Sequence, residues 1–188
     1  MTSRLASEAV VTAKEIRDRL TNGVSLLTLV EGTRASSVSI QRSDNDSEEV
    51  HSLLLPYSGS KDDVIVVRAK LNYCWIRFCV TKELIHLYLN DTNLSSGTTN
   101  LHRIIEQARK SRWSKGDGQV PMETFCFLVA VELVIPTEIR GEISDMHHDR
   151  ALTNHQIADF LKVPQVIVCE YFEWFGEWST ESRKSQGI

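Results

Sequence analysis

The chain has 188 residues, of which 41% are hydrophobic, so it is long enough to fold as one domain with a substantial core. Its net charge of −4 gives no overall basic character and argues against a surface built to bind nucleic acid. The four cysteines form no C-x-x-C pair, as expected for reduced thiols rather than for a disulfide framework or a structural zinc knot.

The N-terminal segment predicts a helix rather than a targeting signal. Apolar residues recur at helical spacing over residues 4–22, and Gly23 follows where such a helix would end. The segment carries many charges and lacks the apolar core of a signal peptide, and no later run is long enough to span a membrane. We therefore expect a cytoplasmic protein that does not insert into a membrane.

The next part of the chain has the pattern of a small sheet. Short runs rich in β-branched and apolar residues are separated by polar clusters, and they cover residues 25–30, 37–41, 50–55 and 64–67. Such runs predict strands, which we interpret as an antiparallel meander or small twisted sheet.

Helical periodicity returns at residue 74. Residues 74–89 place Phe78, Lys82 and His86 on one face of a helix that should bury this face. A polar loop follows, and residues 101–113 predict another helix, whose basic side chains are typical of a solvated surface.

An almost wholly apolar helix is predicted over residues 122–135, between Pro121 and Pro136. Its composition indicates that it is buried. Glu123 lies in its first turn, where a carboxylate is also favoured simply by the helix dipole. Beyond it, residues 152–168 have the cadence of a helix-turn-helix.

Residues 82–86 read K-E-L-I-H, which is the frame of the zinc-peptidase motif H-E-x-x-H with lysine in the first position. In that motif two histidines one helical turn apart bind the metal, and the glutamate between them acts as general base. The ammonium of Lys82 has no lone pair to give a metal. The motif therefore predicts a peptidase-like scaffold with an altered metal site.

Three segments in this order resemble the ImmA/IrrE family of zinc peptidases. Residues 77–87, RFCVTKELIHL, are similar to the family's R-F-x-x-x-H-E-x-x-H. Residues 123–136 look like the family's helix that begins with an acidic ligand and ends in L-L-M-P. The helix-turn-helix-like segment is the third.

The resemblance implies an α+β fold: a zincin-like small antiparallel sheet packed on helices, with a C-terminal helix-turn-helix-like lobe. We accordingly expect a metallopeptidase-like domain over residues 1–148, a helical lobe over 149–178 and a flexible tail over 179–188.

The resemblance also implies a site. Glu83 would be the catalytic base, and His86 and Glu123 would be zinc ligands, with Lys82 in place of the first ligand. Because a catalytic zinc needs about three protein ligands, we expect zinc to bind weakly or not at all. We hypothesise instead that the Lys82 ammonium fills the metal's place by contacting Glu123 or Glu83. In an alternative, the thiol of Cys79 serves as a substitute ligand.

For the whole protein we expect a degenerate peptidase that is inactive and binds a regulatory protein, such as a helix-turn-helix transcriptional repressor. One alternative is an active zinc endopeptidase that cleaves such a repressor. Another is a DNA-binding regulator that uses the C-terminal helices, but residues 151–178 contain only Lys162 against four acidic residues, which makes direct nucleic-acid binding unfavourable.

Overall fold

The structure is a computed structural model that describes residues 4–20, 23–44, 51–55, 62–90, 104–106, 122–135 and 139–172. It is mostly helical with one three-stranded sheet, which confirms the α+β class. The elements are α1 (Arg4–Arg19), α2 (Leu26–Arg34), β1 (Ser37–Ser43), β2 (Ser52–Leu55), β3 (Asp62–Arg68), α3 (Tyr73–Tyr88), α5 (Met122–Val134), α6 (Arg140–His148), α7 (Asn154–Leu161) and α8 (Gln165–Glu170).

The sheet is mixed, so the prediction of an antiparallel sheet is wrong for one of its two pairings. The strand order is β1-β3-β2, with β2 antiparallel to β3 and β1 parallel to β3. The last strand in sequence lies between the first two and runs in the same direction as β1. Alternating apolar residues assign the faces of a strand but not its neighbours, which is why the sequence pattern missed this crossover.

The first predicted strand is a helix instead. Residues 25–30 fall at the start of α2, where the Ser25 hydroxyl accepts a hydrogen bond from the Thr28 amide at 3.1 Å. This is a helix N-cap, and Val30 is fully buried one turn later. A short apolar run has no period that separates strand from helix, so the serine cap was the informative residue.

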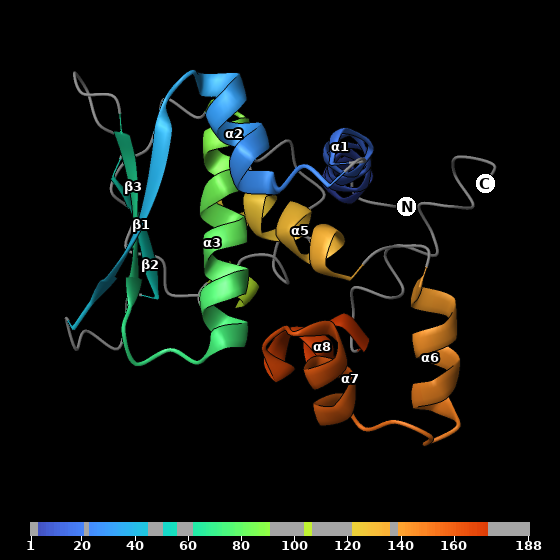
Figure 1. Ribbon diagram of the computed structural model, residues 1–188. Helices are drawn as coiled ribbons and strands as arrows, with labels where there is room; N and C mark the ends of the chain where they lie inside the picture. The colour runs from blue at the N-terminus through green and yellow to red at the C-terminus, as the bar shows by residue number, and fades with distance from the viewer. Residues whose placement is uncertain are drawn as a thin grey trace.

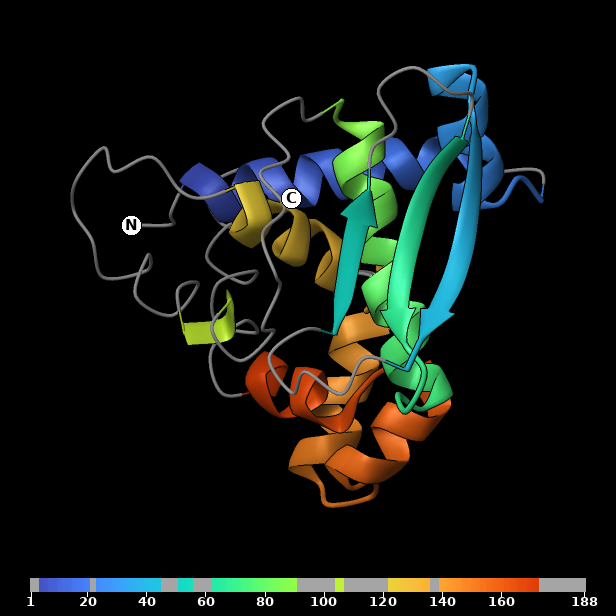
Figure 2. The same cartoon turned by 90° about the vertical axis from the view of Figure 1, so that its left-hand side faces the viewer.

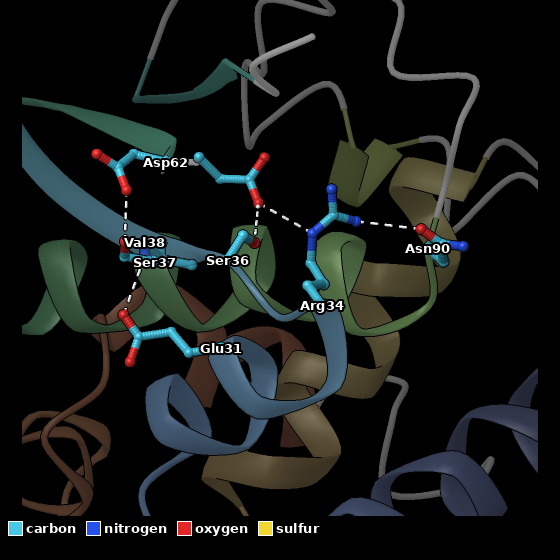
Figure 3. Close-up of polar contacts among 8 residues, drawn as sticks. Glu31, Arg34, Ser36, Ser37, Val38, Asp62 and Asn90 are labelled. Atoms are coloured by element: carbon cyan, nitrogen blue, oxygen red, sulfur yellow. Dashed lines mark hydrogen bonds and ion pairs between the residues drawn. The ribbon is translucent and has the colours of Figure 1, made fainter. Parts of the chain in front are cut away.

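A polar network holds the α2–β1 connection against β3 and the end of α3 (Figure 3). The Arg34 guanidinium donates to Asp63 at 2.9 Å and to Asn90 at 3.1 Å, and Ser36 donates to the same Asp63 oxygen at 3.1 Å. Asp63 is buried, and its ion pair with Arg34 offsets much of the free-energy cost of removing the carboxylate from water. The network thus fixes where β1 begins beside β3.

Helix α3 lies between two apolar clusters. The sheet and α2 lie on one side of it, and α5 and α1 on the other (Figures 1 and 2). Cys79, Leu84 and Leu87 pack toward the sheet, while Phe78 and Ile85 join the larger cluster with α1 and α5. Because both sides of α3 are covered, its polar residues in the middle turns are also enclosed.

The C-terminal helices pack onto the same larger cluster. Thr153 and Gln156 form a capping box at the start of α7, and the Arg77 guanidinium of α3 donates to the Leu161 carbonyl at 2.6 Å. Helix α6 was not predicted. The helix-turn-helix likeness and the three domain boundaries stay predictions, and the tail 179–188 lies outside the described residues.

Of the helix predicted over residues 101–113, only 104–106 are described, and these are helical. In the described part of the chain, the helices are too short or too polar to cross a bilayer.

Candidate functional site

Three elements bring the candidate site together. Asn72 is the N-cap of helix α3, where its side-chain oxygen accepts a hydrogen bond from the Trp75 amide at 3.1 Å. The middle turns of α3 carry Lys82, Glu83 and His86. Helix α5 packs against α3 and presents Glu123 from its first turn. The edge strand β2 contributes a serine. Residues from both sides of α3 can therefore meet in one buried cluster.

The ammonium of Lys82 lies between two carboxylates. Its Nζ is 2.7 Å from Glu123 Oε2 and 3.0 Å from Glu83 Oε1. The Lys82 side chain is 1% exposed, whereas that of Glu123 is 31% exposed. The hypothesis that the ammonium contacts Glu123 or Glu83 is confirmed, because it contacts both. The cluster reaches solvent on the Glu123 side.

Glu83 has a further partner that the sequence did not indicate. The buried Ser52 hydroxyl of β2 donates to Glu83 Oε1 at 2.6 Å, the same oxygen that faces Lys82. Ser52 stands in a short apolar strand and belongs to no motif, so only the packing of β2 on α3 could place it here. Glu83 is thereby held in position from two elements.

His86 lies one helical turn after Lys82 and, like Lys82, faces Glu123. Its Nε2 is 3.4 Å from Glu123 Oε1, and the imidazole is buried. All four residues singled out from the sequence, Lys82, Glu83, His86 and Glu123, therefore meet in space, although the last two lie 37 positions apart in the chain. The proximity required by the family resemblance is present.

The charges in the cluster perturb one another strongly. Burial alone would lower the pKa of the Lys82 ammonium, but the charges of Glu83 and Glu123 outweigh burial and raise the pKa well above its ordinary 10.5. Burial would likewise raise the pKa of the Glu123 carboxyl, but its contact with His86 and the charge of Lys82 lower it to about 2. The Lys82–Glu123 pair is thus fully ionised at neutral pH.

As it stands, the donor set does not fit zinc. Zinc ligands must offer lone pairs, and the residue at the first ligand position offers three N–H donors and a positive charge. That charge lies within hydrogen-bonding distance of both Glu83 and Glu123, where it would repel a divalent cation. We derive no metal-dependent step for these residues.

The thiol considered as a substitute ligand packs in the core. Cys79 lies among the apolar residues between α3 and the sheet, and burial raises the pKa of its thiol to about 12. A zinc ligand must be a thiolate, so this environment disfavours the role. Cys126 is likewise buried in the larger cluster.

The described C-terminal helices pack into the core through their apolar residues. In α8, Ile167 and Val168 are fully buried, and Tyr171 beyond it is buried as well. His147 of α6 stacks on Phe172 with the ring centroids 4.1 Å apart.

A comparison of the chain with protein-family models finds no match, and neither does a comparison with the sequences of curated proteins. The likeness to ImmA/IrrE peptidases therefore depends on the motif residues and on their arrangement.

Proposed function

We propose that this protein is a degenerate ImmA/IrrE-like metallopeptidase domain that binds a regulatory protein, such as a helix-turn-helix transcriptional repressor, without cleaving it. The observation that carries the proposal is the buried Lys82 ammonium, which is 2.7 Å from Glu123 and 3.0 Å from Glu83. The two carboxylates that the family would use for metal binding and base catalysis are here engaged with a lysine.

The loss of hydrolysis follows from the state of Glu83. In a zinc peptidase the corresponding glutamate takes a proton from metal-bound water. In this protein one Glu83 oxygen accepts a hydrogen bond from Ser52 at 2.6 Å and lies 3.0 Å from the Lys82 ammonium. That oxygen already accepts from two donors, so it is poorly placed to take a proton from water.

A binding role is supported by the position of β2. This strand lies at one edge of the described sheet, pairs with β3, and supplies Ser52 to the site. An extended peptide can add to a sheet edge through main-chain hydrogen bonds, a mode of binding that needs no metal. Leu55, at the end of β2, is exposed and could contact such a peptide.

The test combines metal analysis with a binding and cleavage assay. The wild-type protein and Lys82→His are purified without chelator, their zinc content is measured, and each is mixed with a helix-turn-helix repressor encoded near its gene. We expect the wild type to form a complex with the intact repressor and to hold no stoichiometric zinc. Lys82→His should gain about one zinc, because it adds a third ligand to His86 and Glu123.

Lys14→His, on the exposed face of α1, is the matched control and should gain no zinc. Nearly one zinc per wild-type chain, together with repressor cleavage that stops in Glu83→Gln, would show an active enzyme and overturn the proposal. Absence of any complex would remove the binding role.

A further inference from the structure

The contact lengths around Lys82 Nζ are those of an ammonium site. Charge-assisted N–H···O bonds measure about 2.7–2.9 Å, whereas carboxylate oxygens lie about 2.0–2.2 Å from zinc. The observed separations from Glu123 and Glu83 are 2.7 and 3.0 Å. Both separations are hydrogen-bond lengths, with the shorter one to Glu123 in the charge-assisted range.

The Lys82 ammonium is buried and is surrounded by residues from three elements. Lys82 is among the largest fully buried side chains of the described residues, so its methylene groups run through the packed interior to reach the carboxylates. Glu123 comes from α5, and Glu83 is oriented by Ser52 of β2. The positive charge thereby connects α3, α5 and β2 at a single point.

We infer that the space around Lys82 Nζ is a binding site for a primary ammonium group, which Lys82 fills as a ligand tethered to its own helix. Shortening the side chain to alanine leaves two neighbouring carboxylates and a channel with the volume of the removed atoms. Those atoms correspond to propylammonium, so a free primary alkylammonium of this size should bind in their place. The inference depends only on these contacts and is independent of the proposed protein-binding function.

Chemical rescue tests the inference. Thermal unfolding of Lys82→Ala is followed with propylammonium chloride, with tetramethylammonium chloride and with sodium chloride at equal ionic strength. We expect the substitution to lower the midpoint by roughly 10 °C, and propylammonium to restore at least half of this loss with saturation. Tetramethylammonium has no N–H donor and should act like sodium. Lys14→Ala, which removes an exposed helical lysine, should show no rescue.

Equal shifts with propylammonium and tetramethylammonium, or an unchanged midpoint in Lys82→Ala, would overturn the inference. If Lys82→Ala does not fold, Lys82→Met and the double variant Lys82→Met/Glu123→Gln replace it. An ammonium site predicts that the double variant has the higher midpoint, because one uncompensated carboxylate is removed. A double variant that is less stable than Lys82→Met contradicts the site.

Discussion

Helix α5 carries a glutamate near each end, and the two are paired with different cations. Near its start, Glu123 meets the ammonium of Lys82, 41 residues earlier in the chain, at 2.7 Å. Near its end, Glu132 forms an ion pair with Arg140 of α6. The Arg140 guanidinium also donates through Nε and Nη2 to the Ile135 carbonyl, both at 3.2 Å.

The difference separates an ion pair that joins two helices from a cluster of several ionisable groups. Arg140 uses its planar fork to hold a carboxylate and the carbonyl that follows α5, which links two consecutive helices. Lys82 is a point charge between two carboxylates from different elements, with His86 close by. Ionisable groups gathered in this way are typical of former or present functional sites, whereas the arginine joint is explained by helix packing alone.

The largest expected effect comes from removing the Lys82 charge. Lys82→Met should lower the free energy of unfolding by about 3–5 kcal/mol, since it leaves the buried Glu83 carboxylate and the partly exposed Glu123 carboxylate without their shared cation. Arg140→Met leaves the single carboxylate of Glu132 and should lower it less. Chemical denaturation of both variants measures the difference, and a larger loss in Arg140→Met would reverse the comparison.

The Lys82–Glu123 pair should also set the pH range of stability. The pKa of Glu123 is lowered to about 2, so its contribution is present above the ordinary value of 4.5 and is lost as the pH falls toward 2. The pKa of Lys82 is raised, so its contribution is present below 10.5 and is lost only at higher pH. Between pH 4.5 and 10.5 this contribution should be constant.

The measurement is the free energy of unfolding against pH for the wild type and for Glu123→Gln. The variant should lose less stability than the wild type between pH 4.5 and 2. Parallel curves in this acid range would show that Glu123 titrates normally.

A smaller effect is expected when the arginine fork is replaced by a point charge. Arg140→Lys keeps the ion pair with Glu132 but loses the donors that reach the Ile135 carbonyl, so it should destabilise by about 1–2 kcal/mol. Denaturant midpoints test this, with Arg42→Lys at an exposed position of β1 as a control. An unchanged denaturant midpoint in Arg140→Lys would show that only the positive charge matters between α5 and α6.

The smallest of these effects concerns the serine on β2. Ser52→Ala removes one hydrogen bond to Glu83, which keeps its contact with Lys82, so a loss of about 1 kcal/mol is expected. Hydrogen exchange of the β2 amides should also accelerate, since the strand loses its tie to α3. Unchanged exchange there would show that Ser52 does not position the strand.

Local patterns were enough for the elements whose signals are contained in a few residues. Helical spacing predicted α1, α3 and α5, and the motif frame of residues 82–86 selected the site residues on α3. Glu123 was singled out because the resemblance implies an acidic ligand at the start of this helix. The failures were α2, whose short apolar run fits either a helix or a strand, and α6, which was not recognised.

The amino-acid pattern identifies the charged groups and, through the helical period, places Lys82 and His86 on one face. The contact between Glu123 and the ammonium depends on how closely α5 approaches α3, and Ser52 reaches Glu83 because β2 packs on α3. The position of β3 between β1 and β2 is likewise a property of the packed fold. The physical reason is that helical and strand periods act over a few residues, whereas strand order and ion pairing depend on how distant segments pack around one core.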